Sequence, residues 1–285
     1  MKATALKGDE APAHVKPAAP QPPADPEVGR ITRARDGRVF LIGLDRPTKL
    51  NGFTPEMCRE LAYAYTEFEN DPDARCALLF SHGPHFTAGL DLPRMQKVIR
   101  EPRAFCPEGC VDPFDFLEPR RTKPLVTAME GITFTLGLEL MLAGDVGIAA
   151  ADCRFAQLEA KRGIMATGGA TLRMVQRAGW GNAMLFLLSG CEFDADTALR
   201  CGLVQEVTPP GQAYGRARAI AEEIADAAPL AVKAMRANAD MALQESWDRA
   251  IADLAPQQHK LLQTSDAAEG VSSFREKRPA RFTGS

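Results

Sequence analysis

The sequence lacks any hydrophobic run approaching the roughly 18 residues that a membrane-spanning helix needs, so no membrane protein is expected. It also lacks a strong charge of either sign: the net charge of −3 offers no basic surface for nucleic acid or an anionic membrane. The composition, 45% hydrophobic and 25% charged, is ordinary for a folded globular chain. A length of 285 residues therefore predicts one large domain, or one domain with an appended helical piece.

Several functional motifs are missing as well. There is no P-loop, and no GxGxxG follows a predicted strand, so nucleotide and dinucleotide cofactors are not expected. Ser81 and Ser189 lack the G-x-S-x-G context of a serine hydrolase. The seven cysteines are scattered without a CxxC pair, and Cys106 and Cys110, the nearest two, are too isolated for a zinc site. We expect reduced thiols and a cytoplasmic protein.

The first 28 residues are rich in alanine and proline. They contain lysines and acids but no arginine, and they have neither the apolar segment of a secretory signal nor the composition of a transit peptide. We expect residues 1–28 to form a disordered tail without a functional role.

Strands and helices alternate in the first part of the chain and helices alone follow. The sequence around Thr54-Pro55-Glu56 combines an N-cap residue, a proline at the first helical position and an acid in the first turn, so a helix should run from there to about residue 70. Residues 131–135 read as a loop and 136–143 as a short helix. Strands are predicted at 39–44, 76–80, 125–129, 146–150 and 203–207, with a further extended run ending at Glu159.

After Glu159 two helices are predicted, at 170–177 and 182–188, and a third is capped by Asp194. From residue 211 we expect three or four amphipathic helices, interrupted at Pro229 and Pro256. This order implies an α/β core with a helical C-terminal extension.

Glu139 is the one charged residue in the apolar segment 136–143. A carboxylate is costly to bury there unless it is paired or protonated. Glu159 follows 20 positions later, on the far side of a predicted strand. Two carboxylates in unequal, partly apolar environments can serve as general base and general acid. The alternative is structural: a solvent-facing Glu159 beside Lys161 and Arg162, and a buried hydrogen bond at Glu139.

Two backbone amides could form an oxyanion hole. The amide of Leu90 follows Ala88-Gly89 in a turn, and the amide of Leu136 lies in the first turn of the next helix. Free N–H groups at such positions carry partial positive charge. Each donor aimed at a developing enolate would contribute about 3–4 kcal/mol. The alternative is a pair of ordinary capped turns.

Other polar residues favour structural roles. His82 and His85 have HxxH spacing, but no acid accompanies them at a ligand-like position, so turn histidines are expected rather than a metal site. Asp91 is expected to cap a helix and Asp145 to begin a strand.

Taken together, these segments resemble the crotonase (enoyl-CoA hydratase/isomerase) superfamily. The matches occur in order and span residues 38–282, nearly the whole folded chain. They are LDRPTKLNGFTPEM (44–57), HFTAGLDL (85–92), GITFTLGLELMLAGDVGIAA (131–150), FAQLE (155–159), GGATLRM (168–174) and FREKRPARF (274–282).

The resemblance implies chemistry on an acyl-CoA thioester, whose carbonyl oxygen becomes enolate-like between two backbone amides. Those amides fall here on Leu90 and Leu136. In the hydratases two glutamates act together, one activating water for attack at C3 and the other holding the water or delivering the C2 proton. They match Glu139 and Glu159. Isomerases and other branches usually lack one of the two, so the pair favours an enoyl-CoA hydratase of fatty-acid β-oxidation.

The resemblance also implies a spiral of ββα units over residues 29–210 and a helical region over 211–285 that serves oligomerisation and covers the substrate site. Trimers that pair into hexamers are expected, and coenzyme A is part of the substrate, so no separate cofactor is expected. Coenzyme A would lie against the AGLDL turn, with a basic residue of the tail near its phosphates, from the same or a neighbouring subunit. The implied substrate-binding residues are Ala88, Asp91, Leu92, Pro93, Thr167 and Lys277.

Three positions depart from the family pattern. The helix start reads Thr135-Leu136-Gly137 where hydratases commonly have three glycines, so the Leu136 side chain is expected to reshape the pocket. Pro93 replaces a lysine common for the coenzyme phosphates, for which Arg94 or Lys97 could substitute, and Ala166-Thr167 replaces a frequent Pro-Gly pair. Residues 94–118 are expected to form the wall of the acyl pocket.

Two other functions stay open at this stage. One is another crotonase reaction, such as double-bond isomerisation or thioester hydrolysis, for which Glu139 alone would be essential. The other is an acyl-CoA-binding protein without catalysis, suggested by the crowding at Leu136.

Overall fold

A computed structural model describes residues 25, 27–96, 98 and 105–285 of the chain. Lys97, part of the expected pocket wall and nearly all of the expected N-terminal tail lie outside these residues. The described end of that tail contacts the folded body: the carbonyl of Val28 accepts a hydrogen bond from the hydroxyl of Thr54 at 2.7 Å.

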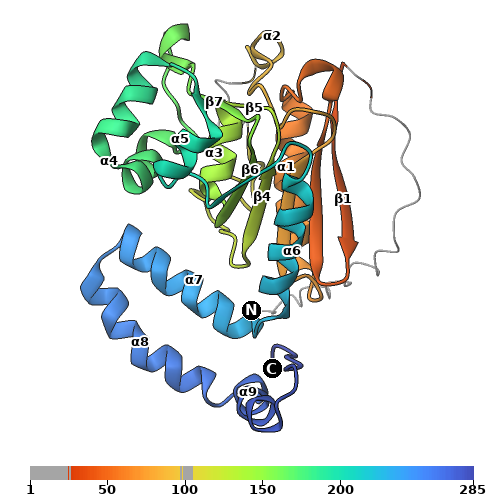
Figure 1. Ribbon diagram of the computed structural model, residues 1–285, viewed down its shortest axis with the longest axis vertical. Coiled ribbons are helices and arrows are strands. Elements are labelled where there is room, and N and C mark those ends of the chain that lie inside the picture. Colours follow the sequence, from red (N-terminus) through yellow and green to blue (C-terminus); the bar gives the residue numbers. More distant parts are fainter. Residues whose placement is uncertain (1–24, 26, 97, 99–104) are drawn as a thin grey trace, which may run out of the picture.

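The body is organised around a six-stranded sheet with the order β1-β2-β3-β4-β6-β9 (Figure 1). The first two strands are antiparallel and the others parallel. The strands are β1 (Arg30–Asp36), β2 (Val39–Asp45), β3 (Cys76–Ser81), β4 (Leu125–Met129), β6 (Val146–Ala150) and β9 (Glu206–Thr208).

The four apolar runs predicted as strands before residue 151 are confirmed as β2, β3, β4 and β6. β1 was missed because its sequence, RITRARD, is mostly polar and lies at the sheet edge. The last strand begins at Glu206 rather than at 203, because Leu203 and Val204 are buried in the turn before it.

A second, three-stranded sheet consists of β5 (Ile132–Phe134), β7 (Arg154–Ala156) and β8 (Phe193–Asp194). The prediction that residues 131–135 form a loop was wrong, since β5 pairs in parallel with β7. Its three residues carry no periodic pattern, and the pairing partner lies about 20 positions away, so the strand is set by tertiary contacts. β5 directly precedes helix α3 (Leu136–Ala143), and β7 follows the strand after that helix, so the small sheet joins the segments before and after α3.

The predicted helix boundaries agree closely with the structure. Helix α1 (Pro55–Asn70) is capped by Thr54, whose hydroxyl accepts from the Met57 amide at 3.2 Å. Helix α3 spans Leu136–Ala143 as predicted. The long helix α4 (Ala170–Ser189) is broken at Gly179 (φ 76°, ψ 163°), between the two helices predicted at 170–177 and 182–188. The remaining elements before β9 are η1 (Pro47–Lys49), α2 (Leu92–Met95), η2 (Glu159–Arg162), α4 (Ala170–Ser189) and α5 (Ala195–Arg200), which Asp194 caps.

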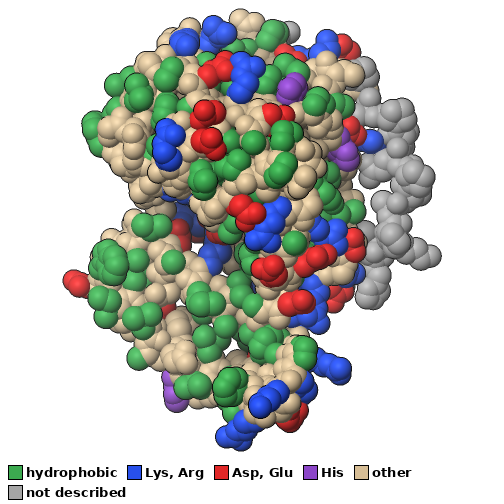
Figure 2. Space-filling model, in the orientation of Figure 1, with side chains coloured by type: hydrophobic (Ala, Val, Ile, Leu, Met, Phe, Trp, Pro, Cys, Tyr) green, Lys and Arg blue, Asp and Glu red, His purple; other side chains and the backbone are tan. Residues whose placement is uncertain are grey.

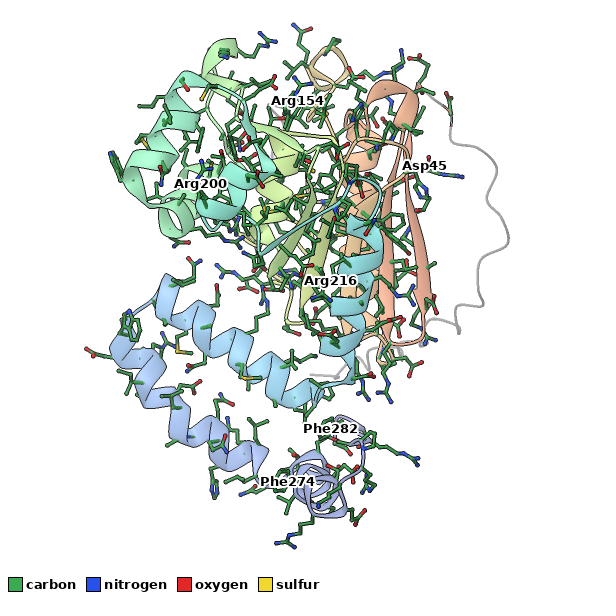
Figure 3. The ribbon with its side chains drawn as sticks, in the orientation of Figure 1. Asp45, Arg154, Arg200, Arg216, Phe274 and Phe282 are labelled. Carbon is green, nitrogen blue, oxygen red and sulfur yellow. The ribbon has the colours of Figure 1, made fainter. Side chains whose placement is uncertain are left out.

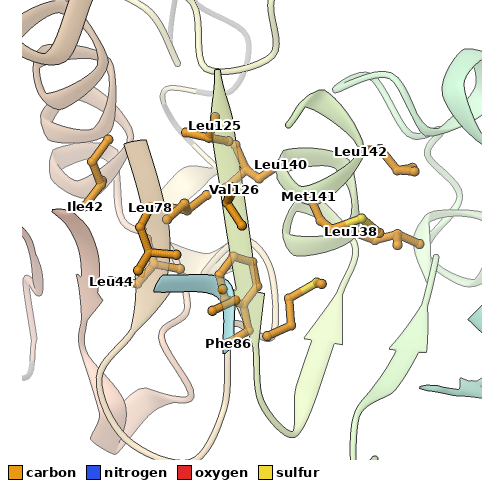
Figure 4. Packing of buried hydrophobic residues seen from close by; sticks show 14 of the residues in the cluster. Ile42, Leu44, Leu78, Phe86, Leu125, Val126, Leu138, Leu140, Met141 and Leu142 are labelled. Atoms are coloured by element: carbon orange, nitrogen blue, oxygen red, sulfur yellow. The ribbon is translucent and has the colours of Figure 1, made fainter. Parts of the chain in front are cut away.

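The core holds α3 against the sheet (Figure 4). Leu78 of β3 and Val126 of β4 are fully buried, as are Leu138, Leu140 and Met141 of α3. Burying such side chains contributes about 1.5–3 kcal/mol each. Because α3 is fixed by apolar side chains around its circumference, the position of the one carboxylate it carries is fixed too.

Four helices follow β9, as expected. Helix α6 (Ala213–Asp226) packs along the main sheet, whereas α7 (Pro229–Gln244), α8 (Trp247–Leu261) and α9 (Ser265–Glu276) extend from the body (Figure 1). Pro229 begins α7, but Pro256 lies inside α8. The prediction of a break at Pro256 was therefore wrong. Ala252, whose carbonyl loses its helical partner there, is solvent-exposed, so water can replace the missing donor.

Hydrophobic side chains lie on the surface of these C-terminal helices (Figure 2), and Phe274 is among them (Figure 3). Phe274 is 85% exposed and Trp247 74% exposed. Arg236 of α7 joins the helices to the body: it pairs with Asp145 at 3.1 Å, the carboxylate that the buried Arg121 also contacts at 2.7 Å. Asp145 directly precedes β6, as predicted. None of the described helices is long and apolar enough to cross a lipid bilayer.

Candidate active site

A cavity of about 620 Å³ lies where the turn after β3, the start of α3 and the η2 turn meet. It brings together seven residues that the sequence analysis selected: Ala88, Leu90, Leu92, Leu136, Glu139, Glu159 and Thr167. Phe105 and Phe114 also line it, from the segment expected to form the acyl pocket wall.

The other selected residues do not line this cavity. Asp91 caps α2, as expected, and accepts from Arg46 at 2.9 Å. Pro93 lies within α2. Arg94, one expected substitute for the phosphate-binding lysine, pairs with Glu27. Lys277 ends α9, well away from the cavity within this chain, so a contact with coenzyme A from Lys277 stays a prediction.

The two turns that carry the candidate amides lie side by side. The amide of Phe134 donates to the carbonyl of Thr87 at 3.0 Å, and the amide of Thr87 donates to Ile132 at 3.0 Å. Among the described residues no acceptor binds the amide of Leu90 or of Leu136. Both residues line one cavity, and an oxyanion hole requires two such amides aimed at one oxygen.

The approach of the two turns depends on Gly89. Its φ is +98°, and a Cβ atom there would lie 1.8 Å from the Thr135 hydroxyl oxygen. A side chain at position 89 would force the Thr135 side chain or the turn itself to move, and φ of +98° would be strained for it. The sequence GLDL therefore has a steric reason for its glycine, beyond the turn itself.

Thr135 has an unusual backbone conformation for a residue with a side chain, at φ 50° and ψ −116°. Its amide donates to Ala156 at 2.8 Å and its carbonyl accepts from the Glu139 amide at 3.2 Å. These contacts hold a conformation that costs about 1–3 kcal/mol for a non-glycine residue. With threonine in place of glycine at this position, the backbone at the cavity wall is therefore strained.

Thr135→Gly is expected to raise the free energy of unfolding by about 1 kcal/mol, because strain relief exceeds the entropic cost of a new glycine. Urea unfolding of the wild type and of Thr135→Gly measures this difference in the free energy of unfolding. Thr133→Gly, in the extended backbone of β5, is the matched control and should lower stability instead. An equal loss of stability in the two variants would contradict the strain at Thr135.

Glu139 is 5% exposed, and its carboxylate accepts from the Ala170 amide at 3.2 Å. Burial raises the pKa of Glu139 from 4.5 to about 7; the Ala170 amide opposes this rise and the charge of Glu159 adds to it. Gly168 lies so close that a Cβ there would be 2.7 Å from the carboxylate. Glu139 is therefore a carboxyl group that exchanges its proton near neutral pH.

The raised pKa makes stability depend on pH. In the unfolded chain Glu139 titrates near 4.5, so between pH 4.5 and 7 the folded state holds more protons. Stability must then fall as pH rises through this window. Glu139→Gln removes the effect while keeping an acceptor for Ala170.

Relative to the wild type, Glu139→Gln is expected to become more stable by roughly 2–3 kcal/mol as pH rises from 5 to 8. Urea unfolding at the two pH values gives this difference. Glu192→Gln, at an exposed surface ion pair with Arg154, is the control and should show little change. A pH-independent difference between wild type and Glu139→Gln would show that Glu139 has an ordinary pKa.

Glu159 is half-buried at the start of η2, and burial raises its pKa as well. Gln157, 1% exposed, contacts it: with its amide nitrogen toward the carboxylate, Gln157 donates to the two oxygens at 2.9 and 3.2 Å. Gln157 was not predicted as a site residue. Leu158, between Gln157 and Glu159, has φ −93° and ψ 0°, which is not extended backbone, so no local pattern indicates that the two side chains meet.

The histidines have structural roles, as expected. His85 accepts from the Ile132 amide at 3.2 Å, and His82 lies 2.9 Å from the Thr32 hydroxyl. In the part of the chain that the structure describes, no group of three or more His, Cys, Asp or Glu side chains could hold a metal ion.

Comparisons with known proteins agree with this fold. The model of the enoyl-CoA hydratase/isomerase family matches residues 34–285. The chain is 32% identical over 258 residues to the enoyl-CoA hydratase EchA19 of Mycobacterium tuberculosis, covering 87% of this chain and 94% of that protein. It is 31% identical to the carnitinyl-CoA dehydratase of Citrobacter koseri, covering 88% and 97%.

A solved structure of a probable enoyl-CoA hydratase/isomerase from Mycobacterium abscessus superposes with a TM-score of 0.86. The two chains are 44% identical, and the match covers 92% of this chain and 100% of that one. The resemblance in fold that the sequence implied is therefore confirmed. By its sequence and its fold, the chain belongs to the enoyl-CoA hydratase/isomerase family.

Proposed function

We propose that the protein is an enoyl-CoA hydratase, which adds water across the C2–C3 double bond of a 2-enoyl-CoA thioester. The observation that carries the proposal is one cavity lined by two carboxylates, Glu139 and Glu159, and by two residues with free amides, Leu90 and Leu136. Isomerisation or thioester hydrolysis would use the two amides but would not require both carboxylates. The relatives carry out different reactions by name, an enoyl-CoA hydratase and a carnitinyl-CoA dehydratase, so this choice rests on the site.

In the proposed reaction the amides of Leu90 and Leu136 bind the thioester carbonyl oxygen. Water, held by Glu139 and Glu159, attacks C3 as one carboxylate takes its proton. The electron pair of the double bond moves toward the carbonyl, whose negative charge the two amides stabilise. A proton then reaches C2 from the other carboxyl group, and the product is a 3-hydroxyacyl-CoA. Coenzyme A would lie against the turn that carries Ala88, and the protein would act in fatty-acid β-oxidation.

Mixing the purified protein with short, medium and aromatic 2-enoyl-CoA esters tests the proposal. Hydration removes the conjugated thioester, so its absorbance should decay. No turnover on any of these esters would contradict it. If the esters bind without reacting, the protein is an acyl-CoA-binding member of the family. Retained activity of another kind in Glu159→Gln but not in Glu139→Gln would identify an isomerase or hydrolase.

We also propose that the protein assembles as trimers that pair into hexamers. The side chains Trp247, Ile251 and Leu254 of α8 and Phe274 of α9 are each more than half exposed, and large apolar side chains gathered at a surface are typical of a protein interface. Light scattering coupled to size-exclusion chromatography measures the mass. A monomer of about 31 kDa would contradict the assembly.

A further inference from the structure

Arg162 is the cation among the described residues that line the catalytic cavity. It ends the η2 turn that Glu159 begins. Side chains three positions apart lie on the same side of a 3₁₀ turn. The guanidinium group and the Glu159 carboxylate therefore belong to the same wall of the cavity.

No described residue neutralises the charge of Arg162. It forms no ion pair or hydrogen bond with the described part of the chain, including Glu159, which lies three residues away. Several other arginines of the described chain are paired, such as Arg121 with Asp145 and Arg154 with Glu192. Arg162 lines the cavity and is exposed to solvent, so a carboxylate on a bound acyl chain can reach its guanidinium group and form the ion pair that the described chain does not supply.

We propose that Arg162 determines substrate specificity by binding a carboxylate at the far end of the acyl chain. The inference rests on the proposed function, which places the thioester carbonyl at Leu90 and Leu136 and C3 beside Glu159. Arg162 lies on the Glu159 wall and not on the turn assigned to coenzyme A, and the inference therefore assigns it to the acyl part. The planar guanidinium group matches a carboxylate with two parallel hydrogen bonds. The substrate class is then the 2-enoyl-CoA monoesters of dicarboxylic acids.

Lys161 provides a matched control. It carries the same charge in the adjacent position, but its side chain packs over Gly190, where its Cε would lie 3.1 Å from a Cβ atom. Lys161 does not line the cavity. If positive charge acts on anionic ligands in a general way, removing the charge of Arg162 or of Lys161 should weaken their binding alike. If the carboxylate is bound within the cavity, only removal of Arg162 should weaken it.

The test uses saturated esters, which bind but cannot be hydrated. Calorimetry gives the dissociation constants of glutaryl-CoA and pentanoyl-CoA, which have five acyl carbons each and differ in the terminal carboxylate. In Arg162→Met the ratio of the glutaryl-CoA constant to the pentanoyl-CoA constant is expected to rise about tenfold. In Lys161→Met the ratio should stay at the wild-type value.

The other outcomes separate the two proposals. If pentanoyl-CoA binds but the ratio is unchanged in Arg162→Met, the inference is overturned while the proposed function stands. If Arg162→Met binds both esters more weakly by the same factor, and the factor disappears with esters that lack the 3′-phosphate, Arg162 binds a coenzyme phosphate. The inference is then overturned as well. If neither ester binds the wild type, the proposed function itself fails.

Discussion

Glu139→Gln and Glu159→Gln are each expected to lower kcat for enoyl-CoA hydration by about three orders of magnitude. Glutamine keeps the size and the acceptor oxygen of each side chain, so the Ala170 contact with Glu139 survives. What is lost is the ability to take or give a proton, which contributes roughly 10²–10⁴-fold in acid–base catalysis. The KM values should change far less, because neither side chain is assigned to bind coenzyme A.

The double variant tests whether the two carboxylates act as a unit. If they hold one water molecule together, removing the second group should cost little once the first is gone, so the losses should not multiply. Glu192→Gln, on an exposed ion pair, should keep wild-type kcat. Retention of more than a tenth of wild-type kcat in either single variant would contradict the acid–base pair.

These variants also separate catalysis from stability. Glu139→Gln should be inactive and yet more stable than the wild type at pH 8, since a buried carboxylate with a pKa near 7 destabilises the folded state when it ionises. A residue retained for structure would show the opposite: its removal would cost stability. That pair of results would assign the buried carboxyl group of Glu139 to catalysis and not to stability.

The local structure of the site could be predicted from the sequence. The bounds of α3 follow from an apolar segment between two glycine-containing turns, and the cap of α1 from Thr54-Pro55. The convergence of Glu139 and Glu159 could not be derived from spacing. It depends on β5 pairing with β7, a contact between short strands without a periodic pattern.

The features that could not be predicted from the sequence are mainly contacts between distant segments. Gln157 was missed because an isolated glutamine gives no signal until its partner's position is known. The link from Arg236 to Asp145 joins residues 91 positions apart, which no local pattern indicates. Conversely, Lys277 was selected by resemblance alone, and within one chain the fold does not bring it to the cavity.

Gly89→Ala is expected to lower kcat/KM by about 10²–10³-fold, the effect of losing one oxyanion-hole donor. The new methyl group would overlap the Thr135 hydroxyl, and φ of +98° is itself unfavourable for alanine. The turn must move to relieve both, and a displacement of about 1 Å at a catalytic group can cost 10²-fold. The amide of Leu90, the next residue, moves with it.

Two further variants identify the cause. Gly37→Ala introduces a methyl group at a similar positive φ, +60°, with no atom within 4 Å, so it should lose about 1 kcal/mol of stability and no activity. Combining Gly89→Ala with Thr135→Gly removes the overlap but not the φ strain, so kcat/KM should recover in part. If Gly89→Ala folds and keeps kcat/KM within threefold of the wild type, the Leu90 amide does not stabilise the transition state. Partial recovery in the double variant would instead show that the contact between Gly89 and Thr135 sets the separation of the two amides.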